Sequence, residues 1–112
     1  MPIQTQIVIA RLTPPAGSYF VSAKVALTGG STYPGSFDCA LGFEQPNSSF
    51  FVVDQEVFRT PTAVTTMLPL QGSLAFTVST DIILTCYNYA QEPATASYAV
   101  LSAIQVGSIT YQ

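Results

Sequence analysis

The 112-residue chain contains no histidine and no tryptophan. Histidine is the side chain that most often serves as a general base, and its imidazole is the commonest protein ligand of metals. Its absence removes the residue on which most acid–base and zinc sites depend. The composition therefore argues against an enzyme of the usual acid–base type.

Charged residues are also scarce. They make up 8% of the chain, with three basic and six acidic side chains, against roughly 25% in a typical domain. A protein that follows nucleic-acid phosphates needs clustered Lys and Arg. No apolar run approaches the roughly 20 residues of a membrane span. We therefore expect neither nucleic acid nor membrane among the partners.

The chain does contain enough apolar side chains for a core, at 48% hydrophobic and 12% aromatic residues. Its length fits one domain, which we place at residues 7–112 after an N-terminal arm at residues 1–6. Side chains alternate between apolar and polar in several runs, which is typical of strands with one buried face. Turn signals rich in Gly and Pro separate these runs. The pattern predicts eight strands and no helix, at about residues 5–12, 17–28, 36–44, 49–58, 62–68, 73–79, 81–89 and 97–109.

The last predicted strand is apolar on both faces. One face carries Tyr98, Val100, Ile104 and Val106, and the other carries Ala99, Leu101 and Ala103. In a two-layer domain only one face of a strand meets the core, so the other face needs another cover. We expect that cover to be a second subunit, with an interface at Tyr98, Val100, Leu101, Ala103, Ile104 and Val106. The alternative is a small sheet with some exposed Ala and Leu, which is normal.

Four short stretches resemble strands of a known family. They are residues 15–25 (PAGSYFVSAKV), 39–41 (CAL), 84–86 (LTC) and 101–109 (LSAIQVGSI). Similar strands occur in short bacterial and phage proteins that resemble the TNF-like, complement-globular-head family. Over residues 7–109, this resemblance implies an all-β, antiparallel two-sheet jelly roll that forms a homotrimer around a threefold axis. The collagen-like stalk of many eukaryotic relatives has no counterpart here, because the sequence has no Gly-X-Y repeat.

The two cysteines, Cys39 and Cys86, both fall on predicted inward faces. A disulfide between them would close a loop of nearly 50 residues and contribute roughly 4 kcal/mol in the chain-entropy model. The alternative is a pair of buried thiols, which synthesis in a cytosol favours. Two cysteines without histidine cannot make a standard four-ligand zinc site in one chain. We therefore expect no metal and no cofactor, and leave both interpretations of the cysteines open.

Two other groups of side chains invite a functional interpretation. Asp54 and Glu56 share a strand face and, with Asp38 or Glu44, resemble the start of a calcium site or a glycosidase pair. A solvated strand face with edge-blunting charge explains them more simply. Exposed tyrosines can anchor a partner or stack on a sugar, or they can pack in the core or at the trimer axis. The tyrosines in question are Tyr33, Tyr87, Tyr89 and Tyr98.

These features predict a non-enzymatic structural protein. The first hypothesis is a trimeric phage capsid decoration (cement) protein whose partners are its own copies and the major capsid protein or another virion protein. No signal peptide is visible, so we expect synthesis in the host cytoplasm and a final place on the virion surface. The alternative is the trimeric receptor- or glycan-binding head of a phage tail fibre or of a protein on the bacterial cell surface. A small hydrolase is a third, weakly supported, hypothesis.

Overall fold

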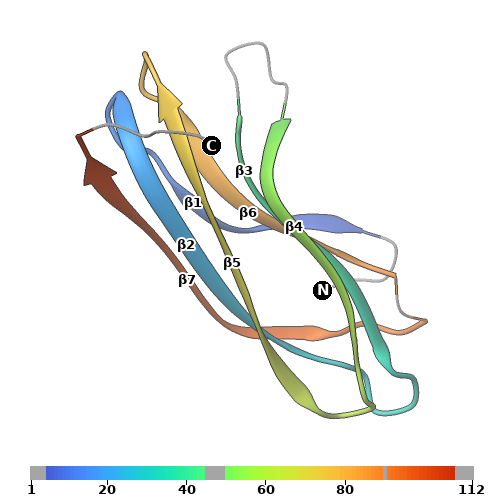
Figure 1. Ribbon diagram of the computed structural model, residues 1–112. Coiled ribbons are helices and arrows are strands. Elements are labelled where there is room, and N and C mark those ends of the chain that lie inside the picture. Colours follow the sequence, from blue (N-terminus) through green and yellow to red (C-terminus); the bar gives the residue numbers. More distant parts are fainter. Residues whose placement is uncertain (1–4, 45–49, 90, 108–112) are drawn as a thin grey trace.

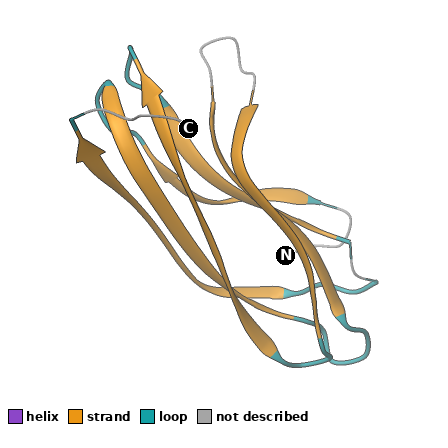
Figure 2. Ribbon diagram, in the orientation of Figure 1, coloured by secondary structure: helices purple, strands orange, loops and turns teal. Residues whose placement is uncertain are grey.

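The computed structural model describes residues 5–44, 50–89 and 91–107. These residues form β-strands joined by loops, without a helix (Figure 2). The seven strands are β1 (Gln6–Leu12), β2 (Gly17–Thr28), β3 (Gly35–Glu44), β4 (Phe50–Thr60), β5 (Thr65–Phe76), β6 (Asp81–Asn88) and β7 (Thr95–Val106).

The strands form two antiparallel sheets (Figure 1). Sheet A has the order β1-β6-β3-β4, and sheet B has the order β5-β2-β7. The inner faces of both sheets contribute to one apolar core. The expectation of an all-β chain with two antiparallel sheets is therefore confirmed, and the arrangement is that of a β-sandwich.

Strand β2 shows how the sequence produces this arrangement. Its alternation places Tyr19, Val21, Ala23, Val25 and Leu27 in the core, all at most 4% exposed. The intervening side chains face outward. On the facing sheet, β3 and β6 contribute buried residues in the same alternating way, so the predicted inward faces of these strands are confirmed. The residues are Phe37, Cys39, Leu41, Ile82, Leu84 and Cys86.

One expected turn is wrong. The sequence pattern separated strands at 62–68 and 73–79 by a turn at Gln71-Gly72, whereas β5 runs without interruption from Thr65 to Phe76. Gly72 pairs with Val21 of β2, and a Cβ on it would lie 2.1 Å from Cγ1 of Val53. The glycine thus allows β4 to approach β5 closely inside a strand. The described residues contain seven strands instead of eight for this reason.

The first and last strands can be compared with the boundaries predicted at the two ends of the chain. Gln6, assigned to the N-terminal arm, is the first residue of β1 and pairs with Tyr87. Residues 1–4 of that arm lie outside the described residues. The last strand ends at Val106, and positions 108 and 109 of the strand expected there also lie outside them.

The strand pairs are nested in the sequence. Strand β3 pairs with β4, β2 pairs with β5, and β1 pairs with β6. Successive pairs belong to sheet A, then sheet B, then sheet A. Strand β7 pairs with β2 on one side and forms an edge of sheet B on the other.

Candidate functional site

The charged side chains are distributed unevenly between the sheets. Seven of the nine lie in the strands of sheet A, and Glu92 lies in the loop before β7. The strands of sheet B contain one charged residue, Lys24 of β2. The strands of the two sheets therefore differ in charge.

The outer face of sheet B carries several exposed apolar side chains among small polar ones. Its register places Phe20 beside Ile104, Lys24 beside Val100, and Ala26 between Met67 and Tyr98. We call the five exposed large residues of this sheet the apolar face: Phe20, Met67, Tyr98, Val100 and Ile104. The row Gln71, Ser22 and Ser102 separates Phe20 and Ile104 from the other three. Exposed apolar side chains between polar ones can mark a surface that binds a partner.

The six residues expected at a subunit interface divide between the two sides of β7. Tyr98, Val100, Ile104 and Val106 lie on the outer side, by their register with β2. Leu101 and Ala103 lie on the inner side, where they pack against the core while staying partly exposed. The outer set is thus available for a face-to-face contact, whereas the inner pair belongs to the sandwich.

Strand β7 also differs from the other edge strands. Strand β1 carries Arg11 and β5 carries Pro69, while β4 carries two carboxylates and an arginine. Charge and proline are common devices that keep an edge from pairing with another chain. The twelve residues of β7 contain neither, although the β2–β7 register shifts once near the start of β7. This edge is therefore the least protected of the four.

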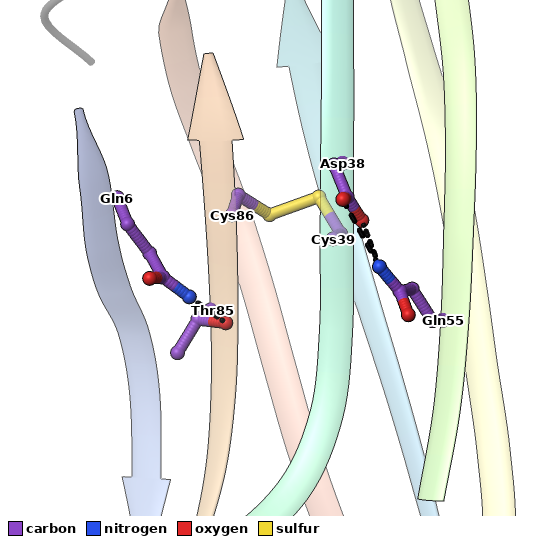
Figure 3. Close-up of a disulfide and its surroundings, with 6 residues drawn as sticks. All are labelled: Gln6, Asp38, Cys39, Gln55, Thr85 and Cys86. Atoms are coloured by element: carbon purple, nitrogen blue, oxygen red, sulfur yellow. Dashed lines mark hydrogen bonds between the residues drawn. A yellow bond between two sulfur atoms is a disulfide. The ribbon is translucent and has the colours of Figure 1, made fainter. Parts of the chain in front are cut away.

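Cys39 and Cys86 form a disulfide in the structure (Figure 3). The two residues lie directly opposite each other on the paired strands β3 and β6, and both are fully buried. The bond joins the two central strands of sheet A. On the outer face of the same strands, Asp38 pairs with Tyr87 and Ala40 pairs with Thr85.

A shallow hollow of about 190 Å³ lies on this outer face, over the disulfide. Gln55 Nε2 donates hydrogen bonds to both carboxylate oxygens of Asp38, at 2.8 and 3.0 Å. Gln6 Nε2 donates to Oγ1 of Thr85 at 3.2 Å (Figure 3). We call this the central hollow; its described lining is Gln6, Asp38, Ala40, Phe50, Val52, Gln55, Thr85, Tyr87 and Tyr89.

Two further hollows adjoin the central one. One, of about 370 Å³, shares Tyr89 and includes Tyr33 and Arg59. The other, of about 330 Å³, shares Gln6, Phe50 and Thr85. The three hollows together follow the outer face of sheet A across its strands.

Hydrogen bonds join the loops beside Tyr33. Glu92 Oε1 accepts hydrogen bonds from the backbone N–H groups of Thr32 and Tyr33, each at 2.7 Å. The N–H of Tyr89 donates to the carbonyl of Ser36 at 2.8 Å. These bonds fix the backbone on which Tyr33 and Tyr89 are presented.

The tyrosines that the sequence grouped together lie on different faces. Tyr87 and Tyr89 form a ring pair with centroids 4.3 Å apart on the sheet A side, and Tyr33 lines the neighbouring hollow. Tyr98 lies on the outer side of sheet B. The two sets can therefore serve different contacts.

The carboxylates do not converge. Asp54 Oδ2 accepts a hydrogen bond from the backbone N–H of Gln71 in β5 at 2.9 Å, and so covers part of that edge. Asp38 accepts hydrogen bonds from Gln55, and Oε2 of Glu44 lies 3.9 Å from Nη1 of Arg11. Among the described residues, no three Asp, Glu, Cys or His side chains are placed to hold a metal ion. A structural role of Asp54 follows directly from its bond.

Asp81 closes the end of sheet A near the β1–β2 loop. Thr13 Oγ1 donates to its Oδ1 at 2.6 Å, and Arg11 donates to its Oδ2. The Thr13 bond first, and then Arg11, hold the pKa of the Asp81 carboxyl below its ordinary value of 3.8. These contacts join β1, the loop that follows it and β6.

No model of a known protein family matches the chain, and no curated protein matches it. In the part of the chain that the structure describes, there is no apolar helix of the length that a bilayer crossing requires.

Both surfaces contain residues that the sequence pattern did not single out. Phe20 and Met67 complete the apolar face, and the outward positions of the alternating β2 pattern were a signal for Phe20. Gln6, Phe50 and Gln55 line the central hollow together with the tyrosines. Their proximity arises from the pairing of β1, β6, β3 and β4, which no local pattern indicates.

Proposed function

We propose that this chain is a non-enzymatic structural protein that forms a homotrimer through the apolar face and decorates a phage capsid. The observation that carries the proposal is the apolar face itself. Five large apolar side chains are exposed on a sheet whose strands hold one charge. Burial of such a surface between copies is worth roughly 25 cal/mol for each Å² removed from water. The trimer and the phage setting rest on the family resemblance.

The nested strand pairs support a jelly roll as the detailed fold. A jelly roll is one long antiparallel hairpin rolled up so that successive strand pairs alternate between two sheets. The pairs β1·β6, β2·β5 and β3·β4 alternate in this way. In an eight-strand jelly roll, β7 would pair with a strand that precedes β1. The open edge of β7 lies where that strand would run.

Lys24 fits this assembly because of its long apolar stem. It lies in a hollow of about 270 Å³ with Ser22, Tyr98, Val100 and Ser102. The methylene groups can pack between Val100 and Tyr98 while the ammonium group stays at hydroxyl groups or water. One lysine per copy therefore does not prevent the face from being buried.

In this proposal the trimer acts by mass action on the shell. A trimer that contacts several copies of the major capsid protein at once gains effective concentration for each further contact. Because it binds the assembled shell and not its separated parts, it shifts the equilibrium toward the shell. A disulfide suits a protein that ends on the outside of a released particle, since disulfides persist in oxidising surroundings.

The test is to add purified chain to capsids that have been stripped of it. We expect rebinding in multiples of three copies and a higher melting temperature of the shell. Capsids that do not bind the chain, or that are equally stable without it, would contradict the decoration role.

A second candidate function is a trimeric receptor- or glycan-binding head of a tail fibre or a bacterial surface protein. The row of hollows on sheet A favours it, because Tyr33 and Tyr89 are exposed there on tied loops. Binding of the chain to host cells, but not to capsids, would support this function over decoration.

A further inference from the structure

We infer that the central hollow on sheet A is a binding site for a neutral sugar ring of an oligosaccharide. The inference deepens the glycan-binding candidate above and rests on it. It concerns the face opposite to the proposed trimer contact, so the two surfaces can act together in one assembly.

Aromatic side chains supply the first part of the site. Tyr87 and Tyr89 are neighbours on the same face, with ring centroids 4.3 Å apart. Tyr89 is 51% exposed, and Phe50 borders the same hollow from β4. The electron-rich face of an aromatic ring attracts the partly positive C–H groups on one side of a pyranose ring. The hollow thus offers a surface for stacking.

Hydrogen-bonding groups supply the second part. The carboxylate of Asp38 accepts two bonds from Gln55, and an ionised carboxylate has about four acceptor positions. The bond between Gln6 and Thr85 uses the amide nitrogen of Gln6, and not its Oε1 atom. Adjacent hydroxyl groups of a sugar can donate to these oxygens. Sites of this kind combine an apolar surface with a few well-placed polar groups.

The charge of the site selects among ligands. Asp38 is the one charged residue among the described lining residues of the central hollow. A phosphate, sulfate or sialic acid would be repelled there, because no cation among these residues compensates its charge. A neutral sugar meets no such penalty. The volume of about 190 Å³ suits a single ring, and the adjoining hollows extend the surface for a chain of rings.

The disulfide preorganises the floor of the site. Cys39 and Cys86 join β3 and β6 directly beneath the pairs Asp38–Tyr87 and Ala40–Thr85. Holding these groups in place before binding reduces the entropy that the ligand must remove. We expect reduction of the disulfide to weaken sugar binding even where the protein remains folded.

The test begins with an array of neutral, sialylated and sulfated oligosaccharides, probed with the whole oxidised chain. We expect binding to neutral glycans. The best neutral glycan is then titrated while amide NMR signals are followed, and shifts are expected at Gln6, Asp38, Gln55 and Thr85. Absence of any bound glycan, or binding confined to acidic glycans, overturns the inference.

Adjacent phenylalanines provide a matched pair of variants. Phe50 lines the central hollow, whereas Phe51 stacks on Phe43 and lines a different hollow. We expect Phe50→Ala and Tyr89→Ala each to weaken the neutral glycan about tenfold, the upper range for loss of one aromatic contact. Phe51→Ala should leave the affinity unchanged. Equal losses for Phe50→Ala and Phe51→Ala overturn the placement of the site.

The two proposals fail separately. A trimer that stabilises capsids and binds no neutral glycan overturns the sugar site and leaves the decoration role intact. A monomer that binds neutral glycans at Tyr89 does the reverse, because the apolar face takes no part in the central hollow.

Discussion

The two sheets of this chain share one core and both expose apolar side chains, but their strands differ in charge. Sheet A carries seven of the nine charges, polar pairs such as Asp38–Gln55, and a row of hollows. Sheet B carries Lys24 and exposes Phe20, Tyr98 and Ile104. Both sheets fold by the same apolar alternation. A buried inner face is enough to determine the sandwich, so the outer faces can differ from each other in charge and in exposed side chains.

The two seams between the sheets also differ. On the β4/β5 side, Leu68, Leu70 and Leu74 are buried, and Asp54 bonds the backbone of β5. On the β1/β7 side, Leu101 and Ala103 remain partly exposed next to the open edge of β7. Val53, Phe58 and Phe76 on the β4/β5 side are also only partly buried, so the difference between the seams lies in the three buried leucines and the Asp54 bond.

The largest expected effect concerns the disulfide that joins the two central strands of sheet A. Reduction of the Cys39–Cys86 bond should lower the free energy of unfolding by about 4 kcal/mol, because the bond closes a long loop in the unfolded chain. Urea unfolding with and without reductant measures this. A Cys39→Ala, Cys86→Ala double variant should show no further effect of reductant. If the free energy of unfolding is the same with and without reductant, the Cys39–Cys86 bond does not stabilise the fold.

The next effect compares the two seams. Leu70→Ala should cost about 3 kcal/mol, since it leaves a cavity at a site that is 2% exposed. Leu101→Ala should cost clearly less in the isolated chain, because its side chain is already partly in water. Urea unfolding of the two variants makes the comparison. Equal losses would mean that the β1/β7 seam is as closed as the other.

Lysine substitutions on the two outer faces should affect monomer stability little, but should differ in their effect on assembly. Ile104 and Val57 are 64% and 66% exposed on sheets B and A, respectively. Either side chain changed to Lys should alter the free energy of unfolding of the monomer by less than about 0.5 kcal/mol, as surface substitutions usually do. Ile104→Lys should dissociate the trimer, whereas Val57→Lys should not. Sedimentation velocity of both variants reports this, and equal behaviour would deny any difference between the faces.

The smallest effect is the acid response of sheet A. The pKa of Asp81 is lowered in the folded chain, mainly by Thr13 and then by Arg11, so its ionised form favours folding. That contribution is complete above the ordinary pKa of 3.8 and is lost as the pH falls through the lower folded value. Asp81→Asn should therefore flatten the acid end of a stability–pH curve. A variant curve parallel to that of the wild type would exclude this role.

Local patterns predicted much of the fold. The alternation in β2, β3 and β6 located the core, and Gly- and Pro-rich turns separated most strands. The pattern failed at Gly72, where glycine marks a close approach of Val53 and not a turn. A glycine signals the need for space, but the neighbour that needs it lies far away in the sequence.

The candidate surfaces were less predictable. Alternation along β7 already placed Leu101 and Ala103 on the face opposite to Tyr98, Val100 and Ile104, but only the register with β2 shows which of the two faces meets the core. The tyrosines were visible as a group, but pairing placed Tyr98 on one sheet and Tyr87 and Tyr89 near the other. Asp38 and Gln55 meet through the β3–β4 pairing alone.

The most direct test of self-association through sheet B is the absolute mass of the oxidised wild-type chain in solution, by size exclusion with light scattering. We expect a mass near three times that of the 11.9 kDa chain. A monomer at micromolar concentration would contradict it, because the apolar face would then remain in water without a partner.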